Sequence, residues 1–289
     1  MTVEKEIDMA PSESYSLTIA KGAEQHASRN VLPAEKPQHV QRELSGKNAL
    51  VTGGTKGIGK ATALKLADRG CNVIVNYFRS RDAAGRAVDE IRERGVEASA
   101  IRGNIGNPDF HKQLFERIRA EYAHLDIFVS NAALGTFTGV FDVTEKIWDL
   151  AMRTNAQAFL FCAQEAIKIM PAGGKIVALS SLGSHRCIPG YSAIGVSKAA
   201  VEALVKYLAA ESSCQGINVN AVCGGFIDTD ALKSFPNYTE LVAEVVRRSP
   251  LDRVGTAEEV ADVVVFLCGA GANWITGQTI IVDGGYSLT

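Results

Sequence analysis

The residues of this sequence that could do chemistry are concentrated in one stretch, SSLGSHRCIPGYSAIGVSKAA (180–200). It contains Tyr191, whose phenol can donate a hydrogen bond or a proton, and Lys198, whose positive charge can lower the pKa of a nearby phenol. Ser181 adds a second hydroxyl upstream of the tyrosine. These side chains predict a site that stabilises negative charge on a substrate oxygen.

The spacing of the tyrosine and the lysine is unusual. Tyr191 precedes Lys198 by seven positions, and the residue four positions before the lysine is Ile194, which cannot donate a proton. Seven helical residues turn through about 700°, so the two side chains would still share a face. The tyrosine Cα would lie about 4.5 Å closer to the helix N-terminus than a residue at the four-residue spacing. Pro189 and Gly190 predict that this helix starts near Tyr191.

A displaced phenol suits the reduction of a conjugated double bond. In carbonyl reduction, hydride goes to the carbon that carries the oxygen. In an α,β-unsaturated thioester, hydride goes to Cβ, and negative charge appears on the thioester oxygen, so a donor for that oxygen must stand farther along the substrate. The spacing therefore predicts an enoyl-thioester reductase. Two alternatives stay open, a 3-oxoacyl or other carbonyl reductase with a shifted tyrosine and a non-catalytic dinucleotide-binding regulator.

A glycine-rich turn, LVTGGTKGIGKATA (50–63), follows an apolar run and opens a helical segment. Gly53, Gly57 and Gly59 allow positive φ angles and let a pyrophosphate approach the backbone at a helix N-terminus. This strand–turn–helix context predicts a dinucleotide site.

The end of the second apolar run, VIVNYFRSR (73–81), bears on the choice of dinucleotide. It carries Arg79 and Ser80 and has no carboxylate before Asp82, and Lys56 adds a cation from the glycine-rich turn. Enzymes that use NAD place an acidic residue here, whereas guanidinium groups bind phosphate. The pattern predicts NADPH over NADH, unless these arginines are simply solvated surface residues.

From residue 48 onward, apolar runs alternate with segments of helical periodicity. The strand-like runs are 48–52, 72–77, 98–103, 126–131, 175–180, 217–222 and 278–283. Their continuous hydrophobicity is typical of parallel strands buried on both faces. We therefore expect one α/β domain over 46–289, a Rossmann-type doubly wound parallel sheet of seven strands with helices on both faces. Residues 1–45 are polar and aperiodic and predict a leader, either poorly ordered or docked on a neighbouring subunit.

Composition narrows the class of protein. The chain has 289 residues, of which 46% are hydrophobic, and a formal net charge of -2, which gives no electrostatic case for binding nucleic acid or an anionic membrane. No apolar run approaches the roughly 18 residues of a membrane span, and the N-terminus lacks a secretory pattern. Six cysteines without a CxxC motif predict reduced thiols, no metal site and a cytoplasmic location.

Together these motifs resemble the short-chain dehydrogenase/reductase superfamily over roughly residues 46–289. The resemblance is carried by the glycine-rich turn, SNAA (130–133), Asn155, Ser181 and the Tyr191/Lys198 pair. The longer tyrosine–lysine spacing is similar to that of NADPH-dependent type III enoyl-acyl-carrier-protein reductases and related enoyl-CoA reductases. The cofactor-binding residues that the resemblance implies are Gly53, Thr55, Lys56, Gly57, Ile58, Gly59, Arg79, Ser80, Asn104, Ile105, Asn131, Ala132, Lys198, Ile227 and Thr229.

The resemblance also implies catalytic roles. Lys198 would bind the nicotinamide ribose and lower the Tyr191 pKa, Ser181 would donate to the substrate carbonyl, and Asn155 would support a water chain to Lys198. The alternative for Asn155 is a satisfied helix amide at a subunit contact. Residues 230–250 could form a lid that carries Leu232, Phe235 and Tyr238 toward an acyl chain, or simply a surface helix.

The remaining implications concern partners. The resemblance implies a homodimer or homotetramer that associates through the segments 143–170 and 190–214. The substrate would be an enoyl thioester on acyl carrier protein or coenzyme A, in fatty acid or polyketide biosynthesis.

Overall fold

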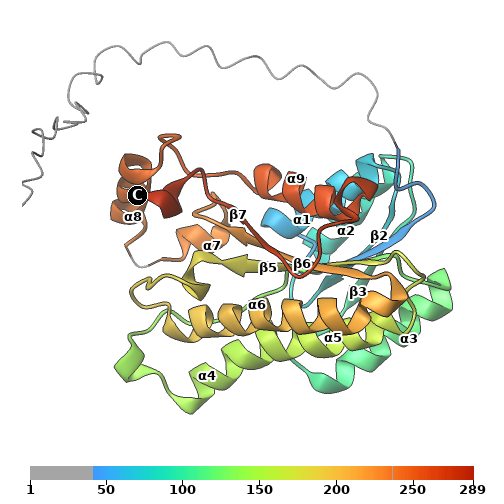
Figure 1. The fold of residues 1–289 in the computed structure, drawn as a ribbon, viewed down its shortest axis with the longest axis horizontal. Coiled ribbons are helices and arrows are strands. Elements are labelled where there is room, and N and C mark those ends of the chain that lie inside the picture. The colour runs from blue at the N-terminus through green and yellow to red at the C-terminus, as the bar shows by residue number, and fades with distance from the viewer. Residues whose placement is uncertain (1–41, 236) are drawn as a thin grey trace, which may run out of the picture. The chain divides into compact units, whose positions relative to one another are not determined.

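The computed structural model describes residues 42–235 and 237–289, which contain a single sheet of seven parallel strands (Figure 1). The strands are β1 (Asn48–Thr52), β2 (Asn72–Tyr77), β3 (Ala98–Arg102), β4 (Ile127–Ser130), β5 (Lys175–Ser181), β6 (Asn218–Gly224) and β7 (Thr279–Val282). Their order is β3-β2-β1-β4-β5-β6-β7, so the direction of winding reverses between β1 and β4. In such sheets, ligands bind at the carboxyl ends of the strands beside this reversal.

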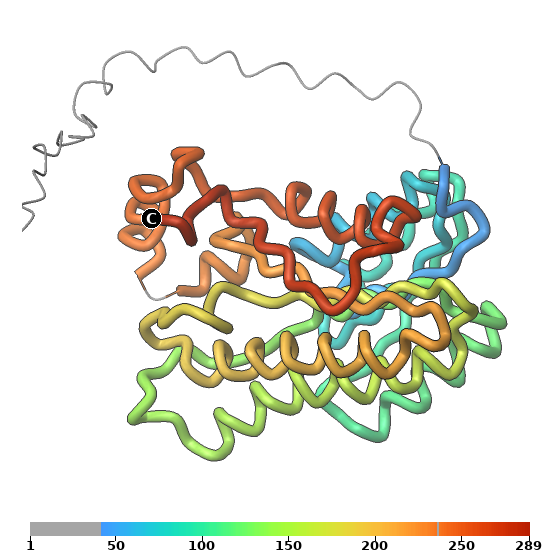
Figure 2. The backbone as a smooth tube through the Cα atoms, viewed as in Figure 1, coloured from blue at the N-terminus to red at the C-terminus, as the bar shows by residue number. Residues whose placement is uncertain are grey.

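Helices cover both faces of the sheet (Figures 1 and 2). One face carries α1 (Gly57–Asp68), α2 (Arg81–Arg92) and α9 (Ala257–Cys268), and the other carries α3 (Pro108–Tyr122), α5 (Ala158–Ile167) and α6 (Ser192–Ser212). Three further helices are α4 (Glu145–Ala151), α7 (Asp230–Lys233) and α8 (Tyr238–Arg248). The predicted doubly wound α/β fold with seven strands is confirmed.

The strands are apolar throughout because each has a helix layer on either side. Val51 and Val75 pack into the core under α1, α2 and α9, whereas their neighbours Leu50 and Ile74 pack into the core under α3, α5 and α6. Both sets are fully buried. This packing explains the continuous hydrophobicity that predicts a parallel sheet, and it holds the strand ends in fixed positions.

The helix that runs from α4 into α5 is interrupted by a π-helical turn at Met152–Gln157. Such turns widen the helix by one residue and often mark functional sites. Thr154 and Asn155 are buried within it. Nothing in the hydrophobic pattern of the sequence indicates this turn.

Most of the predicted leader, residues 1–45, lies outside the described residues. Its last part, 42–45, forms a turn in which Leu44 is buried and its N–H donates to the carbonyl oxygen of Arg69 at 3.0 Å. The packed domain therefore includes residues just before the expected boundary at 45/46. Within the part of the chain that the structure describes, no helix combines the length and the hydrophobicity needed to cross a membrane.

Candidate active site

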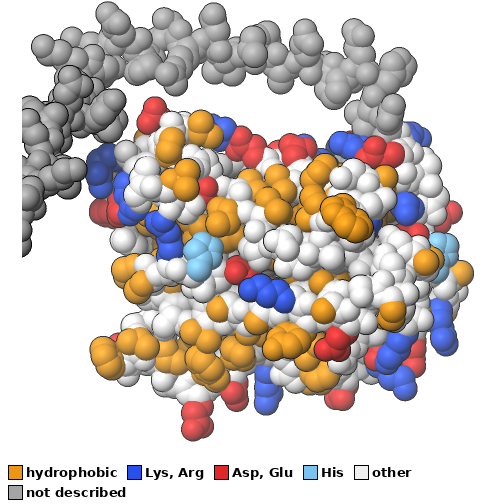
Figure 3. Space-filling view, viewed as in Figure 1, with side chains coloured by type: hydrophobic (Ala, Val, Ile, Leu, Met, Phe, Trp, Pro, Cys, Tyr) orange, Lys and Arg blue, Asp and Glu red, His pale blue; other side chains and the backbone are white. Residues whose placement is uncertain are grey.

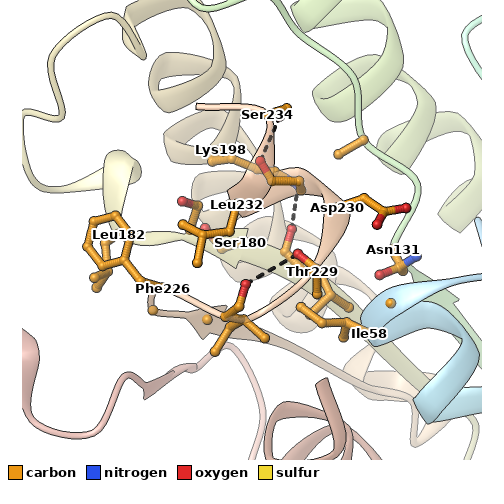
Figure 4. Close-up of a pocket in the computed structure, with 18 of the residues that line it drawn as sticks. Ile58, Asn131, Ser180, Leu182, Lys198, Phe226, Thr229, Asp230, Leu232 and Ser234 are labelled. Atoms are coloured by element: carbon orange, nitrogen blue, oxygen red, sulfur yellow. Dashed lines mark hydrogen bonds between the residues drawn. The ribbon is translucent and has the colours of Figure 1, made fainter. Parts of the chain in front are cut away.

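A cavity of about 590 Å³ opens at the carboxyl ends of β1, β4, β5 and β6 (Figure 4). Its walls come from the glycine-rich turn, the start of α6 and the segment around α7, and Figure 4 shows Asn131, Lys198, Thr229 and Leu232 among its lining residues. The sequence-predicted site residues that line it are Gly53, Lys56, Gly57, Ile58, Asn131, Ala132, Ser181, Tyr191, Lys198, Ile227 and Thr229. The structure thus brings the dinucleotide motif and the tyrosine–lysine pair together. The predicted residues outside its lining are Thr55, Gly59, Arg79, Ser80, Asn104, Ile105 and Asn155.

The glycine-rich turn has the shape of a phosphate cradle. Gly53 and Gly57 have positive φ angles of 64° and 52°, which favour glycine. A Cβ on Gly59 would overlap the Gly53 carbonyl oxygen and the Asn131 amide. That amide donates to the carbonyl oxygens of Thr52 and Gly53 at 2.9 and 3.1 Å, so the end of β4 holds the turn in place. The turn leads into the N-terminus of α1, whose unpaired N–H groups suit an anion such as a pyrophosphate.

The end of β2 is suited to a second phosphate. Arg79 is exposed, with its guanidinium carbon 6.0 Å from the Phe78 ring centroid, and pairs with no carboxylate among residues 42–235 and 237–289. Ser80 caps α2 by accepting the Ala83 N–H at 3.3 Å. The first acidic residue, Asp82, is already inside α2.

Two of the expected cofactor-binding residues, Asn104 and Ile105, follow β3. The Asn104 side chain accepts the Gly106 N–H at 3.0 Å, and the Ile105 carbonyl oxygen lies 2.6 Å from Nε2 of His111. Ile105 is buried, whereas Asn104 is exposed. Their contact with a nucleotide stays a prediction.

The tyrosine and the lysine stand at the start of α6. Tyr191 is the residue before the first helical position, and its carbonyl oxygen accepts the Gly195 N–H at 2.7 Å. Lys198 is buried, and its Nζ donates to the Leu179 carbonyl oxygen at 2.7 Å. Both side chains line the cavity, as their spacing predicts.

Ile194, the residue four positions before the lysine, has a packing role. Ile194 is buried and lies so close to Gly135, in the loop after β4, that a Cβ on this glycine would overlap its side chain. Ile194 does not line the cavity, so Tyr191 is the phenol that reaches it among the described lining residues.

Burial controls the protonation of both groups. Desolvation lowers the pKa of Lys198 to about 8, and the electrostatic influence of Cys223 and Glu202 opposes this shift. Desolvation raises the pKa of Tyr191, while a hydrogen bond with the Ser181 side chain works in the opposite direction. The expected lowering of the Tyr191 pKa by Lys198 is therefore wrong for this structure, because burial dominates. A raised pKa keeps the phenol protonated, which is the form that can donate.

Aromatic rings surround the Tyr191 phenol. Its ring centroid lies 5.9 Å from that of Phe137 and 6.0 Å from that of Phe235, which is nearly parallel at 11°. Phe137 belongs to the loop after β4 and Phe235 follows α7, and their centroids are 4.2 Å apart. The cavity's apolar wall consists of Leu182, Ile188, Phe226, Leu232 and Phe235. The wall suits an apolar acyl group.

Two of the three predicted lid residues, Leu232 and Phe235, line the cavity. The third, Tyr238, packs in the hydrophobic cluster behind them and does not line it. Lys56 and Asp230 form an exposed ion pair at 3.4 Å that joins the glycine-rich turn to α7. The sequence did not indicate Phe137 or Phe226, because nothing local marks them as neighbours of the site.

Asn155 holds the framework next to the lysine. Its amide accepts the Leu134 N–H at 2.9 Å and donates to the Leu134 carbonyl oxygen at 3.1 Å and to the Ser197 hydroxyl at 2.8 Å. The amide is thus satisfied by the loop after β4 and by α6. Its expected part in a water chain to Lys198 stays a prediction.

A polar cluster behind the cavity was not foreseen. Ligand atoms of His185, Glu202 and Cys223 lie within 4.8 Å of one another. Metal ions bind the thiolate form of cysteine, and burial raises the Cys223 pKa to about 12. Glu202 already accepts hydrogen bonds from Ser180 and Ser184. These groups are therefore better suited to a hydrogen-bonded network than to a metal centre.

Comparison with known proteins adds three relatives. The curated 1-cyclohexenylcarbonyl-CoA reductase of Streptomyces collinus is 43% identical over 254 residues, which are 87% of this chain and 91% of that protein. A 3-oxoacyl-acyl-carrier-protein reductase of Staphylococcus epidermidis is 36% identical over 83% of this chain and 98% of its own length. The solved short-chain dehydrogenase of Burkholderia cenocepacia in complex with NADP superposes with a TM-score of 0.79 at 32% identity, and the match covers 85% and 99% of the two chains.

The family comparison covers most of the domain. Residues 53–287 match the family model described as enoyl-(acyl carrier protein) reductase. This match spans the phosphate cradle, the tyrosine–lysine pair and the apolar wall, and it agrees with the sheet order and with the relatives above. The chain therefore belongs to the short-chain dehydrogenase/reductase superfamily of oxidoreductases.

Proposed function

We propose that this protein is an NADPH-dependent reductase of the α,β double bond of an enoyl thioester. The observation that carries the proposal is the displaced phenol. Tyr191 reaches the cavity from the position before α6, while Ile194, at the four-residue spacing, packs against Gly135. A donor set back in this way is farther from Lys198 along the helix, as a conjugated thioester oxygen requires.

NADPH fits the cradle at the β1/β4 reversal. The glycine-rich turn and the α1 N-terminus would bind the diphosphate, and Arg79 and Ser80 would bind the 2′-phosphate. The NADP complex of the Burkholderia relative supports this choice. When bound, the cofactor supplies a hydride to Cβ of the substrate.

The chain's own groups stabilise the charge that hydride addition creates. The Tyr191 phenol donates a hydrogen bond to the enolate oxygen of the thioester, and Ser181 stands within the same cavity as a second donor. Lys198 would hold the nicotinamide ribose. The Tyr191 phenol passes its proton to the enolate, the resulting enol tautomerises to the saturated thioester, and the phenol takes up a proton from solvent. Leu182, Phe226 and the other apolar wall residues exclude water from the acyl group.

A second candidate is the reduction of a 3-oxoacyl thioester or another ketone. The observation that favours it is the presence of Ser181 and Tyr191 in one cavity, a pair that could polarise a ketone oxygen. The relationship to the Staphylococcus 3-oxoacyl reductase supports this alternative. A non-catalytic dinucleotide-binding regulator is the third possibility, and the intact cavity weighs against it.

We also propose that the protein is a homo-oligomer. Figure 3 shows hydrophobic side chains gathered over α4 and α6. Exposed apolar residues in this region are Phe141, Trp148, Val196 and Tyr207. Phe141 is 100% exposed, and a contiguous exposed patch of this kind is typical of a protein interface. The oligomeric state can be measured by light scattering.

The experiment that tests the reaction follows NADPH absorbance with two substrates. A short trans-2-enoyl thioester is compared with the matching 3-oxoacyl thioester, each carried by coenzyme A and by acyl carrier protein. Oxidation with the enoyl substrate alone is expected. Oxidation with only the 3-oxoacyl substrate would select the carbonyl reductase, and NADPH binding without turnover of either would select the regulator. The ratio of rates on the two carriers identifies the physiological thioester.

A further inference from the structure

We infer that Glu202 is a positioning residue of the reductase site, which fixes the turn that presents Ser181 and places a negative charge one helical turn beyond Lys198. This inference rests on the proposed function only in taking Ser181, Tyr191 and Lys198 as the groups that face the substrate and the cofactor. None of the mechanistic steps above uses Glu202.

The first support is a pair of short hydrogen bonds on either side of Ser181. The Ser180 hydroxyl, at the end of β5, lies 2.5 Å from Oε1 of Glu202. The Ser184 hydroxyl, in the turn that follows, lies 2.6 Å from the same oxygen and 2.8 Å from the Ser181 carbonyl oxygen. Hydrogen bonds to a carboxylate are stronger than neutral ones. Glu202 therefore ties α6 to the residue before Ser181 and to Ser184, three residues after it.

The second support is that the same turn carries the Tyr191 ring. Gly183 belongs to the turn Leu182–Ser184, and a Cβ on it would lie 2.5 Å from Cδ1 of Tyr191. The ring thus rests on the backbone that Ser184 and Glu202 hold. A shift of this turn would move both hydroxyl donors of the site at once.

The third support is the charge that Glu202 brings to a buried lysine. Glu202 and Cys223 are the acidic neighbours that oppose the desolvation of Lys198. Cys223, on β6, is also influenced by Asp283, and burial keeps it a neutral thiol. His185 approaches the network through Nδ1, 2.9 Å from the Ser184 hydroxyl. The carboxylate of Glu202 is therefore the negative charge that helps Lys198 to stay protonated.

Three variants separate the positioning role of Glu202 from the effect of its negative charge. Glu202→Gln keeps the shape and an acceptor oxygen but removes the charge, Glu202→Asp keeps the charge, and Ser184→Ala removes one hydrogen bond while the charge stays. The matched control is Glu211→Gln, an exposed residue of the same helix. For each variant, kcat and the NADPH dissociation constant are measured between pH 6 and 10, the latter by NADPH fluorescence.

We expect the alkaline loss of NADPH binding and of kcat to occur at a pH about one unit lower in Glu202→Gln, because the Lys198 pKa falls when the charge is removed. Its kcat at pH 7 should fall about tenfold. Ser184→Ala should lower kcat without changing the pH at which kcat and NADPH binding are lost on the alkaline side. Glu202→Asp should show this alkaline loss at the wild-type pH. Glu211→Gln should match the wild type.

Different results would contradict the role of Glu202 and the proposed function. If Glu202→Gln has the wild-type kcat and loses NADPH binding at the same alkaline pH as the wild type, the inference is overturned. A wild-type protein that oxidises NADPH with neither thioester would refute the proposed function instead. The NADPH-binding profiles would then still decide the role of Glu202, because they need no turnover.

Discussion

Gly195 and Gly183 meet backbone to backbone where the first turn of α6 rests on the turn after β5. A Cβ on Gly195 would overlap the carbonyl oxygen of Gly183. The absence of both side chains lets Tyr191 and Ser181 share one cavity. This contact makes the geometry of the two donors sensitive to a single methyl group.

Gly195→Ala is expected to separate the two turns. The new methyl group meets backbone, which cannot rotate away, so we expect a loss of about 1–3 kcal/mol in the free energy of unfolding. The kcat should fall as well, because the Tyr191 ring moves with its turn. Urea denaturation and steady-state kinetics measure the two effects.

The control for this substitution is Gly85→Ala in α2, where no atom lies within 4 Å of the added methyl group. Replacing glycine within a helix should stabilise the protein by about 0.5–1 kcal/mol and leave kcat unchanged. Equal stability of the two variants would show that the contact between α6 and the β5 turn is not tight.

Tyr191→Phe should remove the donor and keep the ring packing on Phe137 and Phe235. We expect kcat to fall by about 10²–10⁴-fold, the range typical for loss of a general acid. The NADPH dissociation constant should stay near the wild-type value, because the cradle is intact. Tyr122→Phe, at the end of α3 and outside the cavity lining, is the control. Full activity in Tyr191→Phe would refute the assignment of the phenol.

The buried Lys198 should give activity and stability opposite dependences on pH. Its pKa is lowered to about 8, so the charged form, and with it kcat, is lost as the pH rises through 8. An unfolded lysine titrates near 10.4, so between these values the unfolded state binds more protons and the free energy of unfolding rises with pH.

Lys198→Met tests this linkage. The variant should be inactive, yet at pH 7 at least as stable as the wild type, because it no longer buries a charge. Its melting temperature should also lose the increase between pH 8 and 10. A strongly destabilised Lys198→Met protein would mean that the hydrogen bond to the Leu179 carbonyl outweighs desolvation.

Arg79→Ala tests the choice of dinucleotide. If this guanidinium binds the 2′-phosphate, the KM for NADPH should rise about tenfold or more, whereas the KM for NADH should not change. Arg86→Ala, an exposed position farther along α2, is the control. Equal effects on the two cofactors would place Arg79 outside the phosphate site.

The sequence was informative wherever a local pattern reflects the final environment. All seven strands were predicted because burial on both faces leaves continuous apolar runs, and β1 and β2 have the predicted bounds. The meeting of Tyr191 and Lys198 in one cavity followed from helical geometry alone.

Features that depend on tertiary packing were not predictable in this way. Phe137 and Phe235 are distant in sequence and meet only because α7 folds over the loop after β4. Glu202 looks like an ordinary surface residue of a helix, and only the docking of α6 on β5 brings it to Ser180. The Tyr191 pKa was misjudged for the same reason, since the depth of burial cannot be read from spacing.

The strand order also sets the sequence in which a growing chain can build its site. β1, β2, β3 and β4 are neighbours in the sheet, so the glycine-rich turn and the Asn131 amide that ties it down are available once the first four strands exist. Tyr191 and Lys198 arrive with α6, and Leu232 and Phe235 arrive last. Because synthesis proceeds from the N-terminus, the residues of the nucleotide cradle are made before the reactive groups that face it. The chain therefore presents its candidate cofactor-binding half first and its candidate reactive half second.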